Sequence, residues 1–71
     1  MTKTELLNQK IKDSGITITY IASKMGISRE GLYKKMMNET EFKASEIVAL
    51  ANILRLTKAE RDDIFLARSV N

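Results

Sequence analysis

Arg29, Glu30, Tyr33 and Lys34 are the residues whose types and spacing offer the clearest chemistry in this chain. In a helix, side chains three and four positions apart are neighbours, so these four would share one outward surface. Their hydrogen-bond donors and acceptors are long enough to reach the base edges and phosphates of DNA. The pattern predicts a recognition surface that acts through hydrogen bonds and charge.

Catalytic and metal-binding chemistry has few candidate residues. The chain contains no Cys and no His, which excludes the usual zinc spacings and the Ser-His and Cys-His nucleophile pairs. The carboxylates of Glu60, Asp62 and Asp63 form a small cluster that would suit a cation or acid and base chemistry. Neighbouring helical residues diverge by about 100°, which favours a solvated face instead. We therefore expect no enzyme, and no cofactor, metal or small-molecule substrate.

Two short helices that meet at a sharp turn would position the four polar residues. Ala22 suits a close crossing of helices, and Gly26 would end the first helix in the left-handed conformation, which costs other residues about 1–2 kcal/mol. Ile27 would fill the space under the turn, Ser28 would cap the second helix, and Leu32 would face inward. An ordinary helical hairpin has the same pattern, but the outward polar residues favour DNA recognition.

The segment resembles the helix-turn-helix of the lambda-repressor-like (Cro and phage-repressor, Xre-type) DNA-binding domains. In that family an Ala, a Gly, a following apolar residue and a later apolar residue keep the spacing of Ala22, Gly26, Ile27 and Leu32. The similarity continues through EFKASEIVALANILRLT, which resembles the later helix of the family. The resemblance implies a compact, all-α, five-helix domain spanning residues 1–71. Its helix-turn-helix would cover about residues 17–37, with a recognition helix at 28–37.

The chain departs from the family pattern at two positions. The family often has a phosphate-clamping Gln where this chain has Ile18, so only Thr17, just before it, would donate there. The family also tends to have an apolar residue three positions after Leu32, where this chain has Lys35. Met36 is then expected to take the inward role, with the recognition helix slightly rotated.

The resemblance implies a sequence-specific, double-stranded DNA-binding transcriptional regulator, a repressor or Cro-like protein of phage or prophage type. An alternative is a protein-interaction module, antitoxin-like or antirepressor-like, that uses its apolar C-terminal helix. For the regulator, the expected contacts with base edges are made by Arg29, Glu30, Tyr33 and Lys34, and those with phosphates by Thr17, Ser28, Lys35 and Asn38.

The net charge of +3 at pH 7 is unevenly distributed along the chain. Residues 1–35 contain seven Lys or Arg against three acidic residues, giving +4, whereas residues 36–71 contain five against six, giving −1. Positive charge is expected in the half that faces phosphate. For Lys3, Lys10 and Lys12, a solvated helix face explains the charge as well as DNA contact does.

No apolar run approaches the roughly 20 residues that span a bilayer, so we expect a cytoplasmic protein without membrane contact.

The remaining sequence predicts further helices. Thr2 with Glu5, and Thr57 with Glu60, have capping-box spacing and predict the starts of the first and last helices. Gly15 would end the first of these. With no Pro in the chain, we expect five helices and no sheet. Another helix is predicted by apolar residues at i, i+3, i+4 and i+7, namely Ile47, Leu50, Ala51 and Leu54.

Three consecutive apolar residues, Ile64, Phe65 and Leu66, lie in the predicted last helix. Three consecutive residues cannot all face one core, so an exposed apolar patch is expected, and such patches often mark contacts. We therefore predict a homodimer, at least on DNA, with these residues at its interface. The alternative is a broad apolar stripe buried wholly within the monomer.

Overall fold

The computed structural model describes residues 2–65, and these form five α-helices. The helices are α1 (Thr4–Ser14), α2 (Ile18–Met25), α3 (Arg29–Met36), α4 (Ala44–Leu54) and α5 (Lys58–Phe65). No strand occurs within residues 2–65, which confirms the all-helical class and the number of helices. No helix in this range has both the length and the apolar character needed to cross a membrane.

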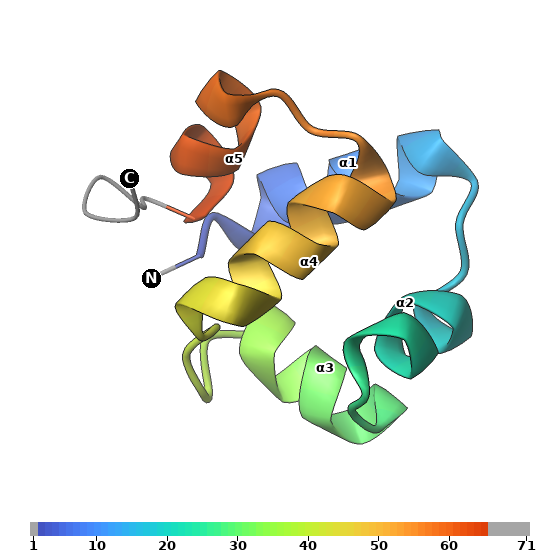
Figure 1. Ribbon diagram of the computed structural model, residues 1–71. Coiled ribbons are helices and arrows are strands. Elements are labelled where there is room, and N and C mark those ends of the chain that lie inside the picture. Colours follow the sequence, from blue (N-terminus) through green and yellow to red (C-terminus); the bar gives the residue numbers. More distant parts are fainter. Residues whose placement is uncertain (1, 66–71) are drawn as a thin grey trace.

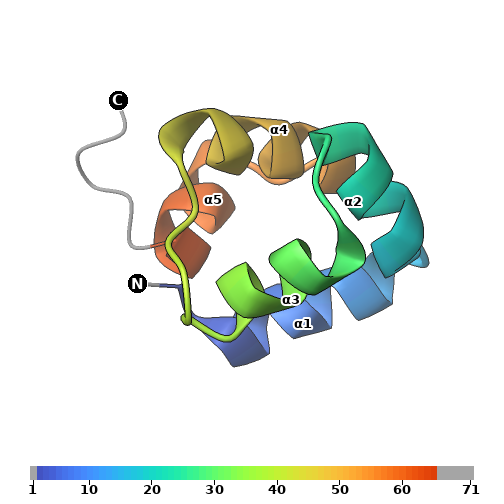
Figure 2. The same ribbon diagram turned by 90° about the horizontal axis from the view of Figure 1, so that it is seen from below.

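Helix α4 lies at the centre of the arrangement and contacts α1, α2 and α5 (Figure 1). Seen from below, α4 and α1 lie on opposite sides of the core, as do α5 and α2, while α3 covers the side nearest the viewer (Figure 2). Helix α3 packs chiefly against α2. None of the other four described helices covers the outward face of α3.

Each helix contributes one apolar stripe to a single core. The predicted inward residues of α3, Leu32 and Met36, are both buried. In α2, Ile21 and Ala22 are buried, while Ile18 packs partly against the core. Removal of such side chains from water is the main stabilising contribution in a domain of this size. The other buried core residues are Leu7, Ile11, Phe42, Ile47, Leu50, Ile64 and Phe65.

Left-handed glycines and a capping box mark three of the helix ends. Gly15 and Gly26 both have left-handed backbones, with φ of 72° and 73°, and end α1 and α2 as predicted. The capping box of Thr57 and Glu60 is also confirmed, since each side chain accepts a hydrogen bond from the backbone N–H of the other. The predicted capping box of Thr2 and Glu5 is wrong, since Lys3 is the N-cap of α1 and the backbone N–H of Thr2 donates to Asn38. The helix itself begins at Thr4, next to the predicted start near Lys3.

Three contacts join α1 and the residue before it to α5. The backbone N–H of Lys3 donates to the carbonyl of Ile64 at 2.7 Å, and its ammonium pairs with Asp63 at 2.7 Å. The ammonium of Lys10 pairs with Glu60. The Lys10 ammonium and the Thr57 N–H together lower the pKa of Glu60 from 4.5 to about 2. The Glu60 carboxylate therefore stabilises both the start of α5 and its attachment to α1.

This depressed pKa predicts acid sensitivity. Between pH 4.5 and about 2 the unfolded chain binds a proton at Glu60 that the folded chain does not, so stability is present above pH 4.5 and is lost as pH falls through this range. Lys10→Met should reduce this loss, because it removes the largest cause of the shift. Urea denaturation at a series of pH values measures the effect. Lys12→Met, on the exposed side of α1, is the control, and equal pH dependence in both variants would contradict the prediction.

The left-handed turn at Gly26 predicts a backbone penalty for substitution. A Cβ atom at Gly26 would meet nothing within 4 Å, so Gly26→Ala should be destabilising through φ alone, by about 1 kcal/mol. Gly26→Asn should cost less, since Asn adopts the left-handed region more readily. Thermal unfolding of the two variants beside wild type provides the measurement. Equal stability of Gly26→Ala and wild type would show that the turn does not need glycine.

Candidate nucleic-acid interface

Hydrogen bonds fix both ends of α2. The hydroxyl of Thr17 accepts from the N–H of Tyr20 at 3.1 Å, which starts α2. At the other end, the N–H groups of Gly26 and Ile27 donate to the carbonyls of Ser23 and Ala22, at 3.1 and 3.0 Å. This pair of bonds is the Schellman arrangement, which satisfies carbonyls that a helix end leaves free. The direction of the chain into α3 is therefore fixed by backbone bonds.

Helix α3 begins with a capped first turn. The hydroxyl of Ser28 accepts from the N–H of Gly31 at 2.9 Å, as predicted for an N-cap. A Cβ atom at Gly31 would lie 3.1 Å from this hydroxyl oxygen, which is a tight contact. Gly31 thus leaves room for the cap, which accounts for a glycine in the first turn of a helix.

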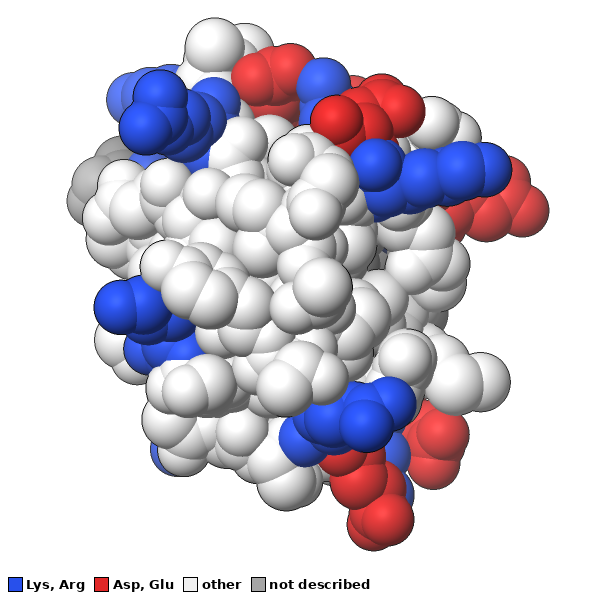
Figure 3. All heavy atoms as spheres, turned by 90° about the vertical axis from the view of Figure 1, so that its right-hand side faces the viewer, with Lys and Arg blue, Asp and Glu red and all other residues white. Residues whose placement is uncertain are grey.

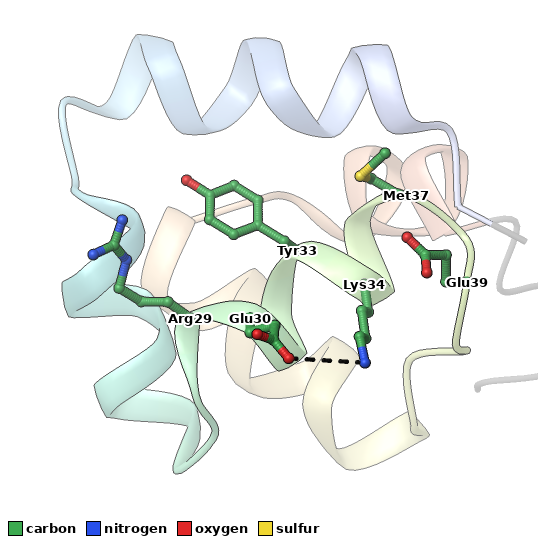
Figure 4. Close-up of a pocket in the computed structure, with 6 residues that line it drawn as sticks. All are labelled: Arg29, Glu30, Tyr33, Lys34, Met37 and Glu39. Carbon is green, nitrogen blue, oxygen red and sulfur yellow. Dashed lines mark ion pairs between the residues drawn. The ribbon is translucent and has the colours of Figure 1, made fainter.

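The outward face of α3 carries the four residues predicted for base contacts. Arg29, Glu30, Tyr33 and Lys34 are all exposed and line one shallow pocket of about 480 Å³ (Figure 4). Glu30 and Lys34 form an exposed ion pair at 3.9 Å. Arg29 makes no ion pair within residues 2–65, so its guanidinium is available to a partner. The structure therefore brings the four predicted side chains together on one surface.

Two further residues complete this surface, Met37 and Glu39. Met37 ends α3 and is 64% exposed. Asn38 follows with a left-handed backbone, φ 64°, and turns the chain so that the N–H of Glu39 donates to the carbonyl of Lys34. An Asn after a helix is a sequence signal for such a reversal. Glu39 was not predicted from the sequence, and it adds a second carboxylate to the surface that Glu30 lines.

Lys35 is one of the residues predicted to contact phosphate. Its ammonium instead pairs with Glu46 of α4 at 3.1 Å and donates to the carbonyl of Glu41 at 3.1 Å. Both side chains of the pair are only 14% exposed. Burial alone would raise the pKa of Glu46, but the N–H of Lys43 and the ammonium of Lys35 outweigh it and lower that pKa. Lys35 therefore links α3 to α4.

Asn38, also predicted to contact phosphate, is engaged inside the fold. Its side-chain oxygen accepts from the N–H of Thr2 at 2.8 Å, and its side-chain nitrogen donates to the carbonyl of Thr2 at 3.0 Å. The hydroxyl of Thr4 donates to the carbonyl of Met36 at 2.8 Å. These bonds fix the end of α3 against the start of α1. The predicted phosphate contacts are thus divided: Thr17 and Ser28 are exposed caps, whereas Lys35 and Asn38 hold the helix in place.

The residues predicted for a dimer interface are also divided. Ile64 and Phe65 are 0% and 4% exposed, so the expectation that an apolar patch is exposed is wrong for these two. Both are buried because α5 packs against α1 and α4 together, and Phe65 meets Phe42 edge to face with ring centroids 5.2 Å apart. Leu66 lies outside the described residues. Oligomerisation itself stays a prediction.

The acidic residues of α5 do not converge on one site. Glu60 pairs with Lys10 and Asp63 with Lys3, while Asp62 accepts from the adjacent Arg61 at 2.8 Å. Within residues 2–65 no three acidic side chains are grouped so as to hold a metal ion. The three carboxylates act as partners for three different cations.

Charge is spread over the surface without one dominant basic patch on the face seen in Figure 3. Its Lys and Arg side chains lie around the margin, with acidic groups beside some of them, and the middle is uncharged.

Comparison of the chain with models of known protein families, with curated proteins and with solved structures finds no match. Its function is therefore inferred from the geometry and chemistry of its own residues.

The two neighbouring lysines of α3 should differ in their effect on stability. Lys35→Met leaves the part-buried Glu46 without its cation and should lower the free energy of unfolding by about 1 kcal/mol. Lys34→Met breaks only an exposed, long ion pair and should change it by less than about 0.5 kcal/mol. Urea denaturation at neutral pH compares the two variants. A larger loss in Lys34→Met would contradict the assignment of Lys35 to the fold.

Proposed function

We propose that this protein binds double-stranded DNA sequence-specifically by laying α3 in the major groove. The observation that carries the proposal is the outward face of α3, where Arg29, Glu30, Tyr33 and Lys34 line one surface. The major groove is about 12 Å wide and admits a helix, and these side chains carry donors and acceptors that suit base edges. The capped turn before α3 supports the proposal, because a reading helix needs a fixed approach angle.

Each side chain has a distinct role in this proposal. The guanidinium of Arg29 suits the O6 and N7 acceptors of guanine, and Glu30 accepts from the amino group of cytosine or orients Arg29. Lys34 exchanges its ion pair with Glu30 for an acceptor on DNA. The exposed faces of Tyr33 and Met37 suit the methyl group of thymine.

Phosphate contacts are proposed for the two capping residues. The hydroxyls of Thr17 and Ser28 accept from their own helices, and each keeps a hydrogen to donate to a phosphate oxygen. The N-terminus of α3 adds a favourable dipole there. Lys35 and Asn38 serve the interface indirectly, by fixing the position of α3.

The helix order and the spacing across the turn support a lambda-repressor-like domain, and with it a transcriptional regulator that occupies an operator. Blocking polymerase in this way requires only tight binding at a defined site. If two copies bind together, the half-sites should lie about 34 Å apart, one helical turn of DNA. The contact between the copies is not assigned to Ile64 or Phe65, since both are buried.

Binding-site selection from random double-stranded DNA tests the proposal. Wild type should enrich a defined sequence, and Arg29→Ala should weaken binding to that sequence by about 1–3 kcal/mol while affecting scrambled DNA much less. Lys58→Ala, an exposed change at the start of α5, is the matched control for lost charge. Equal affinity of wild type for selected and scrambled DNA would rule out sequence-specific recognition.

A further inference from the structure

A second concave surface lies between α2 and the end of α4. It is a shallow hollow of about 430 Å³, and none of its residues comes from α3 or lines the pocket there. We call it the α2–α4 hollow. Its lining residues are Ile16, Tyr20, Lys24, Asn52, Ile53 and Arg55.

Arg55 is in a backbone conformation that its side chain disfavours. It ends α4 with φ 55° and ψ 43°, in the left-handed region. The N–H groups of Arg55 and Leu56 donate to the carbonyls of Asn52 and Ala51, the same arrangement that Gly26 makes at the end of α2. A glycine would relieve the strain at this position. The side chain of Arg55 is exposed and makes no hydrogen bond or ion pair within residues 2–65, so the described fold does not account for it.

Tyr20 and Lys24 present an aromatic ring and a second cation at the same hollow. The ammonium of Lys24 lies 5.5 Å from the centre of the Tyr20 ring and has no carboxylate partner within residues 2–65. Tyr20 is 50% exposed, so part of its ring is open to a ligand. A Tyr one turn before a Lys keeps the cation over the ring and leaves the edge of the ring accessible.

The lining of the hollow combines positive charge with apolar surface. It contains two cations and no acidic residue, in contrast to the surface of α3, where Glu30 and Glu39 lie beside the cations. Ile16 and Ile53 are half-buried and form its apolar part. A ligand that fits must therefore bring negative charge and an apolar group together.

We propose that the α2–α4 hollow binds an acidic peptide segment of another protein. Carboxylates of the peptide pair with Lys24 and Arg55, and an apolar side chain between them packs against Tyr20 and Ile53. The side-chain amide of Asn52 is placed to bond the peptide backbone. A DNA backbone would use the two cations but would leave the Tyr20 ring and the isoleucines without an apolar partner.

Nuclear magnetic resonance titration of the ¹⁵N-labelled protein tests this inference independently of DNA recognition. The probes are a short synthetic peptide of Glu and Asp around a central Leu, the same peptide with Gln and Asn in place of the acids, and a short DNA duplex. The acidic peptide should shift the amide signals of residues 20–24 and 52–56, none of which is proposed to contact DNA. The neutral peptide should leave them unchanged. Absence of these shifts, or their appearance with the duplex alone, would overturn the proposal.

Two sets of variants complete the test. Lys24→Glu with Arg55→Glu should weaken binding of the acidic peptide about tenfold or more, whereas Lys12→Glu with Lys58→Glu makes the same change of net charge elsewhere and should have little effect. Arg55→Gly should raise the Tm by relieving the strained backbone, and should still weaken peptide binding. Equal weakening by both charge-reversed variants would show that only net charge matters, against the proposal.

Discussion

The free backbone groups at the ends of short helices are the constraint on which this structure depends. A helix leaves its first four N–H and last four C=O groups without partners inside the helix. In the eight-residue helices α2, α3 and α5, these are half of the backbone N–H groups and half of the backbone C=O groups. Such helices are not stable alone in water. The hydroxyls of Thr17 and Ser28, the carboxylate of Glu60 and the left-handed residues after α1, α2 and α4 satisfy part of this need. The same capped ends determine where each helix points.

The position of α3 results from contacts that lie behind its outward face. Leu32 and Met36 bury its inner side, Lys35 ties it to Glu46 on α4, and Asn38 ties its end to the residues before α1. None of these contacts uses a residue proposed to touch a base. Positioning and recognition are therefore assigned to different side chains of one short helix, so a change in one function need not disturb the other.

Local features of this fold were predictable from the sequence, and distant ones were not. The caps at Thr17 and Ser28 and the turn at Gly26 depend on residues within one helical turn, so the spacing of these residues in the sequence was enough to predict them. The roles of Lys35 and Asn38 depend on partners 11 and 36 positions away, which no local pattern reveals. Helical periodicity did not predict that Ile64 and Phe65 are both buried, because their burial depends on the packing of α5 against α1 and α4 together.

The attachment of α1 to α5 has a consequence for the order in which the chain acquires its structure. Lys3 with Asp63, and Lys10 with Glu60, join residues 60 and 50 positions apart. During synthesis α1 leaves the ribosome before α5, its packing partner, has been made. These contacts of long sequence separation add loop-closure cost to an otherwise local helical fold, so we expect it to fold more slowly than a bundle of sequential neighbours. The packing of α1 is thus completed only when α5 has been made.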